Sequence, residues 1–273
     1  MRIIRVFPRK TNATPVDDLV RIGTEPGLFD EADEVHVSCT FTWDLPLAER
    51  LVKAWSCVAP VRIGGPATGE AGGEFVPGRY VKNGYVITSR GCNNKCWFCR
   101  VPAVEGDIRT IRINDGWNLL DDNLLQCPDS HIREVFDMLK RNKSQGPVQF
   151  TGGLEAKRLE PWHVELLRDL KPKQLFFAND TPDDLEPLQR AGRMLLDAGF
   201  TTASHALRAY VLCGWPKDTI EAAAIRMQET ISAGFLPMAM LYRDNSGRRD
   251  PVWQKWGRQW ARPSIAASKA EKL

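Results

Sequence analysis

Short apolar segments alternate with amphipathic segments between residues 84 and 242, and this alternation constrains the fold more than any other feature of the sequence. Apolar strands that alternate with helices form parallel sheets with right-handed crossovers. The pattern therefore predicts an α/β protein in which six strands form an open, partial (β/α)6 barrel. The expected strands are 84–89, 117–122, 148–153, 174–180, 207–214 and 236–242, and the expected helices are 129–141, 161–170, 183–198 and 218–233.

Polar residues and glycines stand at the carboxyl ends of these expected strands, where parallel sheets collect their chemistry. They are Cys92 after the first strand, Asp121, Asp122 and Asn123 after the second, Gly152 and Gly153 after the third, Asn179 and Asp180 after the fourth, and Gly214 after the fifth.

The first part of the chain predicts a small Rossmann-like α/β unit. Its order of elements resembles the later part of a cobalamin-binding domain. The Asp-x-His-x-x-Gly motif that supplies the cobalt ligand there is absent, and His36 lies inside an expected strand, so we expect no cobalamin. The elements expected in this unit are strands at 2–7, 33–39 and 61–65, and a helix from about Pro46 to Cys57 with Asp44 as its N-cap.

A glycine- and proline-rich stretch, PATGEAGGEFVPG, follows this unit and indicates a linker. The predicted domains are therefore the Rossmann-like unit at 1–65, the linker at 66–83, the barrel at 84–242, and a basic, tryptophan-containing helical extension at 243–273.

Three of the seven cysteines lie close together, as Cys92, Cys96 and Cys99 in the segment GCNNKCWFCR. The N-terminus does not read as a secretion signal and no apolar run is long enough to span a membrane, so we expect a cytoplasmic protein. In a reducing compartment, clustered cysteines indicate metal or redox chemistry rather than disulfides. The other four, Cys39, Cys57, Cys127 and Cys213, are expected to be small buried hydrophobic residues.

Three thiolates are one fewer than a closed site needs. Structural zinc sites and ordinary cubane clusters use four ligands. A [4Fe–4S] cluster held by three cysteines keeps one iron free for a small molecule, and Arg90, Lys95 and Arg100 would offset part of its negative charge. Two alternatives stay open: zinc with a remote fourth ligand, and an electron-transfer cluster with Cys127 or Cys213 as fourth ligand.

The motif Cys92-x3-Cys96-x-Phe98-Cys99, after the strand that opens a βα series, resembles the radical S-adenosylmethionine (SAM) superfamily over residues 84–242. The resemblance implies that the free iron binds SAM and that an external one-electron reductant, such as flavodoxin or ferredoxin, drives its cleavage. It also implies that the resulting 5′-deoxyadenosyl radical abstracts a substrate hydrogen and that Phe98 packs by adenine.

The superfamily usually binds the SAM amino group with Gly-Gly-Glu at its second strand. Here that strand ends in Asp121, Asp122 and Asn123, which we expect to take this role. The alternative is that it falls one strand later, on Gly152, Gly153 and Glu155 of TGGLEA. Gly152 and Gly153, in TGGLEA, would let SAM or substrate approach the backbone, or form a tight turn. Asn179 and Asp180 are expected at the ribose, or as a helix cap. Gly214 lies in the segment whose backbone flanks adenine in the superfamily.

The C-terminal extension carries eight Lys or Arg against three Asp or Glu. Its tryptophans share one helical face, which indicates either a nucleic-acid surface or an apolar cap on the barrel. The residues concerned are Trp253, Trp256 and Trp260, flanked by Lys255, Arg258 and Arg262.

The segments NLLDDNLL, FTGGLEA and LCGWPKDT resemble small phage-type iron–sulfur oxidoreductases, some of which act in thymidine hypermodification of viral DNA. That resemblance implies a nucleic-acid or modified-nucleoside substrate, an N-to-C rearrangement of a glycyl group, and the host cytoplasm as location if the protein is phage-encoded. Two alternatives are a radical SAM enzyme acting on a peptide or free small molecule, and a non-catalytic iron–sulfur protein that binds nucleic acid.

Overall fold

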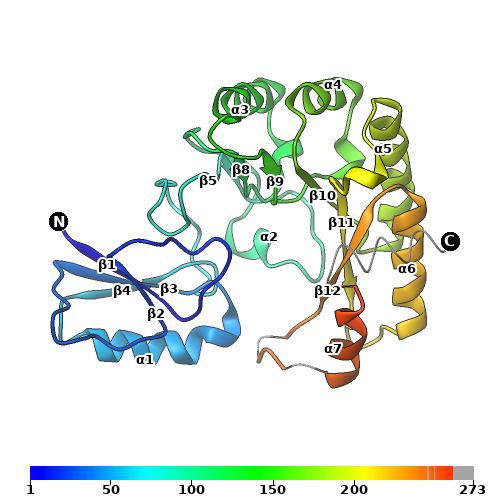
Figure 1. The fold of residues 1–273 in the computed structure, drawn as a ribbon. Coiled ribbons are helices and arrows are strands. Elements are labelled where there is room, and N and C mark those ends of the chain that lie inside the picture. Colours follow the sequence, from blue (N-terminus) through cyan, green and yellow to red (C-terminus); the bar gives the residue numbers. More distant parts are fainter. Residues whose placement is uncertain (245, 249, 261–273) are drawn as a thin grey trace.

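The computed structural model describes residues 1–244, 246–248 and 250–260. A small α/β unit made from the start of the chain lies to one side of a larger α/β body (Figure 1). We call residues 1–65 the N-terminal unit and the larger body the barrel. Within the described residues, no helix is both long and apolar enough to cross a membrane.

The N-terminal unit is a four-stranded, fully parallel sheet in the order β2-β1-β3-β4, with one helix packed on it. Ile4, Val35 and Trp55 are completely buried at this contact. The elements are β1 (Ile3–Phe7), β2 (Val20–Ile22), β3 (Glu34–Ser38), α1 (Leu45–Trp55) and β4 (Val61–Gly64).

Asp44 does not cap α1, so that expectation is wrong. Its side chain makes no capping hydrogen bond and is instead gripped by the Arg9 guanidinium through both carboxylate oxygens. The ion pair joins the loop after β1 to the start of α1, and a paired charge is a stronger competitor for a buried carboxylate than a backbone amide.

The barrel contains a six-stranded sheet in the order β12-β11-β10-β9-β8-β5, and every pairing in it is parallel. This confirms the predicted α/β class and the open, partial barrel. The strands are β5 (Tyr85–Val86), β8 (Asn118–Leu119), β9 (Gln149–Phe150), β10 (Gln174–Ala178), β11 (Leu207–Cys213) and β12 (Leu236–Leu241).

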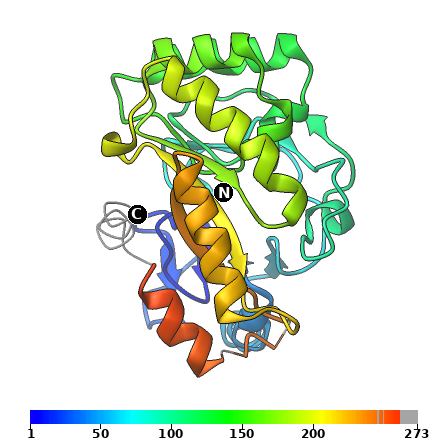
Figure 2. The same cartoon turned by 90° about the vertical axis from the view of Figure 1, so that its right-hand side faces the viewer.

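Amphipathic helices cross between these strands and cover the outer face of the sheet (Figures 1 and 2). Each presents its apolar stripe to the strands, and the largest buried cluster joins Leu139 of one helix to Phe150, Leu175 and Phe177 of the sheet. The crossover helices are α3 (Asp129–Asn142), α4 (Pro161–Leu170), α5 (Leu185–Asp197) and α6 (Ile220–Ser232), and short 3-10 helices precede α1, α3, α4, α5 and β11.

The expected first barrel strand is divided in two. β5 ends at Val86, and a second piece, β6 (Ser89–Arg90), leaves the sheet to pair antiparallel with β7 (Arg109–Thr110). Where the chain turns away from the sheet, Thr88 and Ser89 both donate hydrogen bonds to the buried Asp121 carboxylate. These bonds replace the sheet pairing that the turn gives up.

The C-terminal extension contributes α7 (Pro251–Arg258), which Asp250 caps through the backbone N–H of Val252. Trp256 and Trp260 are buried against β11, β12 and α6, and Trp253 packs beside them. The tryptophan stripe is therefore part of an apolar core. Arg262 lies outside the described residues.

The segment between β12 and α7 reaches back to the N-terminal unit (Figure 1). The Arg243 guanidinium lies 4.7 Å from the ring centre of Trp43. Gly247 packs so closely on Trp43 that an added Cβ would overlap that side chain. We call this contact the clasp. The clasp thus joins two parts of the chain that are distant in sequence.

Candidate functional site

The three clustered cysteines lie on one loop, residues 91–100, which runs from β6 to α2 (Val101–Val104) and which we call the cysteine loop. The Gly91 N–H donates to the Asp122 carboxylate at 2.8 Å, and the Asn93 N–H donates to the side-chain oxygen of Gln126 at 2.7 Å. Gly91 has φ +86° and packs on the backbone of residues 106 and 107, a position that only glycine fits. The loop is therefore held by residues that follow β8.

All seven cysteines are free thiols; Cys39, Cys127 and Cys213 are buried as expected, whereas Cys57 is exposed, so its expected burial is wrong. In the cysteine loop Cys96 is exposed, and Cys92 and Cys99 are half-buried. Burial raises the pKa of the Cys96 and Cys99 thiols, and the neighbouring thiols and carboxylates add to that effect. Metal binding, which needs thiolates, would therefore release protons here.

No group of three or more His, Cys, Asp or Glu side chains among the described residues is arranged around a single metal ion. In a cubane cluster each thiolate binds a different iron, so the three sulfurs need not converge on one point. The Asn123 amide also lies here: its Nδ2 is 3.6 Å from the Cys92 sulfur, and its Oδ1 is buried without a hydrogen-bond partner in the described chain. These residues fit a three-thiolate cluster.

Asp121 holds the segment that leads into the cysteine loop. Its carboxylate accepts hydrogen bonds from the Thr88 N–H at 2.6 Å, the Thr88 hydroxyl at 2.6 Å and the Ser89 hydroxyl at 2.7 Å. Burial raises its pKa to about 6 against the opposing effect of these bonds. The arrangement fixes the approach to the cysteine loop. Contact between Asp121 and SAM stays a prediction.

Two further carboxylates are joined to the cysteine loop, Asp122 directly through the Gly91 N–H and Glu155 through Asn123 and Gln126. Asp122 is partly exposed, and burial raises its pKa. Glu155 accepts from the amides of Asn123 at 2.8 Å and Gln126 at 2.9 Å, and it pairs with Arg158 at 3.2 Å. These amide donors, followed by Arg158, hold its pKa below the usual value despite burial, so Glu155 is ionised at neutral pH.

The glycine pair after β9 divides into two roles. A Cβ on Gly152 would overlap the backbone of Leu120 and Asp121, so this glycine permits close packing at the end of β8. A Cβ on Gly153 would meet no atom nearer than 3.9 Å, so its face is open. Close backbone packing accounts for Gly152, and close approach of a ligand remains the prediction for Gly153.

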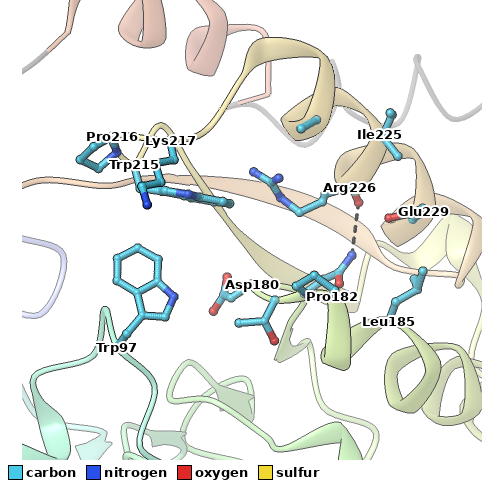
Figure 3. A pocket seen from close by; sticks show the side chains of 13 residues that line it. Trp97, Asp180, Pro182, Leu185, Trp215, Pro216, Lys217, Ile225, Arg226 and Glu229 are labelled. Atoms are coloured by element: carbon cyan, nitrogen blue, oxygen red, sulfur yellow. Dashed lines mark hydrogen bonds between the residues drawn. The ribbon is translucent and has the colours of Figure 1, made fainter.

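A cavity of about 730 Å³ lies at the ends of β10 and β11, and we call it the aromatic cavity (Figure 3). Trp97 of the cysteine loop forms one wall, 61% exposed, with its ring centre 6.1 Å from that of Trp215. The Arg226 guanidinium lies 4.4 Å from the Trp215 ring centre. Asp180 lines the cavity, and burial raises its pKa to about 6. Its Oδ1 accepts the Leu212 N–H at 2.7 Å.

The other predicted residues near this cavity have packing partners. Asn179 is buried and its amide donates to Thr230 at 3.0 Å and to the Arg226 carbonyl at 3.3 Å, which ties β10 to α6. Gly214 has φ +78° and lies against Trp253 of α7. Phe98 makes an edge contact with Trp97 at 5.4 Å. The helix-cap alternative for Asp180 is wrong, because Thr181 and Asp184 form the capping box.

Trp97, Gln126 and Arg158 were not singled out by sequence reasoning. Trp97 sits at the unspecified position of the cysteine motif, and its neighbour Trp215 is more than a hundred residues away. Gln126 and Arg158 are ordinary polar residues whose role appears only when the ends of β8 and β9 meet.

No protein-family model matches the sequence, and no curated protein matches it. Solved structures do match, and they show that the chain has the fold of radical SAM enzymes. One is the radical SAM methyltransferase TsrM from Kitasatospora setae with cobalamin and a [4Fe-4S] cluster, at TM-score 0.63 and 11% identity over 88% of this chain and 74% of that chain.

TsrM with its tryptophan substrate and the SAM analogue aza-SAM matches at TM-score 0.57 and 12% identity, over 88% of this chain and 72% of that chain. Coproporphyrinogen III oxidase (HemN) from Escherichia coli, a radical SAM enzyme, matches at TM-score 0.46 and 14% identity, over 68% of this chain and 52% of that chain.

Proposed function

We propose that the protein is a radical SAM enzyme in which Cys92, Cys96 and Cys99 bind a [4Fe–4S] cluster. The observation that carries this is a loop with three free thiols that follows β5 and β6, at the start of a six-stranded parallel sheet with this fold. When bound, the cluster supplies the electron that cleaves SAM to a 5′-deoxyadenosyl radical, which removes a hydrogen atom from the substrate.

The chain's own residues bind and orient SAM in this proposal. The ionised Glu155 accepts from Asn123, whose amide lies beside Cys92, and the partly exposed Asp122 accepts the Gly91 N–H, so both carboxylates suit the SAM ammonium group. The aromatic cavity suits the adenosyl part: Trp97 and Trp215 provide apolar surface, and Asp180 provides an acceptor for ribose hydroxyls. Phe98 makes an edge contact with Trp97. Asn123 positions Glu155 against the loop.

Anaerobic reconstitution tests the cluster. We expect about four iron and four sulfide per chain, from the three-thiolate loop. Ser in place of Cys92, Cys96 or Cys99 should abolish cluster binding, whereas Cys57→Ser, a matched change at an exposed cysteine, should not. Reduced protein should release 5′-deoxyadenosine from SAM. Zinc without iron, or SAM left intact under reductant, would contradict the proposal.

For the substrate, we propose a group on a nucleobase, and specifically a glycyl group joined through nitrogen to the 5-methylene of thymidine. In the rearrangement a hydrogen leaves the glycyl α-carbon, the bond from the methylene to nitrogen breaks, and a bond from the methylene to the α-carbon forms. The hydrogen is then returned to the nitrogen, which becomes a free amine. This is an isomerisation that needs no oxidant. The resemblance in NLLDDNLL, FTGGLEA and LCGWPKDT supports it.

Deuterium at the glycyl α-carbon tests this reaction. Mass spectrometry should show deuterium in 5′-deoxyadenosine. The carbon-linked product should be one mass unit lighter than the substrate, because deuterium on the amine exchanges with water. SAM cleavage that no nucleoside or DNA stimulates, and that a peptide or another small molecule does stimulate, would favour the alternative substrate classes.

A further inference from the structure

A second cavity, of about 800 Å³, lies between the N-terminal unit and the barrel, and we call it the interface cavity. Its size is that of a small-ligand site, for which about 300–1,000 Å³ is usual. Three parts of the chain line it: the strand ends of the N-terminal unit, the segment 70–81, and the barrel residues around α2. Trp97 lines the aromatic cavity, while Arg90 and Arg100 line this one, so both cavities border the cysteine loop.

The N-terminal sheet has a switch point between β1 and β3, from which the chain continues to opposite sides of the sheet. After β1 the chain passes to β2 on one side, and after β3 it passes through α1 to β4 on the other side. In open parallel sheets, ligands bind outside the carboxyl ends of the strands at such a switch point. Residues 7–9 after β1 and Ser38 at the end of β3 line the interface cavity. This sheet therefore presents its usual ligand-binding edge to the barrel.

Arg90 is the buried cation on the barrel side of this cavity. Its side chain is 18% exposed, and its Nε is buried without a hydrogen-bond partner among the described residues. The nearest acid, Glu105, is 3.4 Å away and is shared: it also pairs with Arg109 at 2.7 Å and accepts the Gly72 N–H at 2.9 Å. A buried donor left unpaired in a native protein calls for a further partner.

The other charges around the cavity leave the barrel side short of negative charge. Arg100 also lines it and has no ion-pair partner in the described chain. The carboxylates on that side are used, Glu105 as above and Asp122 by the Gly91 N–H. Across the cavity Asp44 is held by Arg9, Arg62 pairs with Glu34, and Arg79, Glu70 and Glu74 are exposed, where solvent and salt screen them.

We propose that the interface cavity is the substrate site and that Arg90 binds an anionic group of the substrate, a carboxylate or a phosphate. Guanidinium groups bind both anions through paired N–H donors. The inference rests on the proposed function and adds the substrate class. Arg90 precedes Cys92 by two residues, so an anion held there is anchored at the start of the cysteine loop.

Calorimetric titration of the intact, reconstituted protein without SAM or reductant tests this inference. The probes are thymidine bearing N-linked glycine on its 5-methylene, the same nucleoside with the carboxylate converted to a carboxamide, and thymidine 5′-monophosphate. If the anion is a carboxylate, the first probe should bind about ten- to a hundredfold tighter than the carboxamide. If it is a phosphate, the monophosphate should bind and the first two probes should bind equally weakly.

Variants locate the binding. Arg90→Gln should weaken the preferred anionic probe about ten- to a hundredfold, and Arg90→Lys, which keeps the charge but loses the fork, should weaken it less. Arg141→Ala, an exposed arginine on α3, is the matched control and should leave binding unchanged. Should Arg90→Gln fail to fold, the comparison of carboxylate with carboxamide on the unaltered protein still decides.

The outcomes separate this inference from the proposed function. Binding of an anionic probe through Arg90 with no SAM cleavage would overturn the radical SAM proposal and keep the cavity assignment. SAM cleavage with no anionic probe bound, or with equal binding in the Arg90 variants, would overturn the cavity assignment alone. Competition of the bound probe by hydroxocobalamin would also overturn it, because the cavity would then belong to a cofactor.

Discussion

Asp121 is a carboxylate that the fold has taken out of water. It receives three hydrogen bonds from Thr88 and Ser89, and burial still raises its pKa to about 6. A carboxyl whose pKa is higher in the folded state binds more protons there than in the unfolded chain. Its ionisation therefore lowers stability as the pH rises from about 4 to 6, and the full cost remains above that window.

The pH dependence of stability should reveal this group. Asp121→Asn removes the titration, so urea unfolding of the two proteins between pH 4 and 8 should give curves that are not parallel. As the pH falls through the window, the free energy of unfolding of the unaltered protein should rise by about 3 kcal/mol relative to the variant, because the pKa shift is about two units. Asp180, whose pKa is also raised to about 6, contributes equally to both proteins and cancels. Parallel curves would show that Asp121 does not titrate there.

Glu155 and Asp122 are the two residues that we propose for the SAM ammonium group. Glu155→Gln should weaken SAM binding about tenfold or more, because a charge-assisted hydrogen bond contributes about 1.5–3 kcal/mol. Iron content should stay unchanged, and Glu165→Gln, at an exposed position on α4, should behave as the unaltered protein does. Equilibrium dialysis measures the affinities. Loss of affinity in Asp122→Asn alone would assign the group to Asp122.

At this scale the sequence predicted the cysteine loop, because its spacing is local. It placed polar residues at strand ends, but it could not say which of them face a ligand. Asn179 and Asp121 look alike as strand-end polar residues, and both are consumed by buried hydrogen bonds to distant segments. Arg90 looks like any cation near thiolates, and its unpaired Nε follows only from how Glu105 is shared.

Among the elements, the helices were predicted closely and the strands less so. The helical stripes of α3 and α4 are set by local periodicity, and their ends match within a residue. β8 spans two residues of an expected six, because the chain turns where Asp121 bonds to residues 88 and 89. β2 was missed, since three half-buried residues carry no readable alternation.

The helix α7 is a structural element by its burial. Trp256 is 8% exposed and packs with Trp260 against β11 and α6. Trp256→Ala should therefore destabilise the protein by about 3–5 kcal/mol in urea unfolding. Val252→Ala, on the exposed side of the same helix, should cost far less. An unchanged unfolding midpoint for Trp256→Ala would show that the tryptophans do not contribute to a core.

Lys255 and Arg258 lie on the exposed side of α7, and nucleic-acid binding remains a prediction for these two residues. Alanine at both positions should lower DNA affinity and reduce the salt slope by about 0.9 for each phosphate that the protein no longer neutralises. Folding should be unaffected. A titration at several salt concentrations with an unchanged slope would make this face ordinary solvated surface.

On the scale of the whole molecule, the clasp joins the barrel to the N-terminal unit. Gly247 has φ +68° and leaves no room for a side chain against Trp43. Gly247→Ala should lower the thermal midpoint more than Gly199→Ala does, because Gly199 has φ +97° but no atom within 4 Å of an added Cβ. The Gly199 variant measures the cost of placing alanine at a positive φ, and any larger shift at Gly247 reports the lost contact with Trp43. Equal shifts would mean that the clasp contributes nothing.

The clasp also sets the order in which the molecule is completed during translation. The N-terminal unit ends at Gly64 and has its own buried core, so it is able to fold while later segments are still being synthesised. The barrel awaits β12, and the contact with Trp43 awaits Arg243 and Gly247. The residues that line the interface cavity lie between Phe7 and Asp122, so they are synthesised well before the clasp that joins the two parts of the molecule. A nascent chain has its cysteines in place well before it has an enclosed site to protect them.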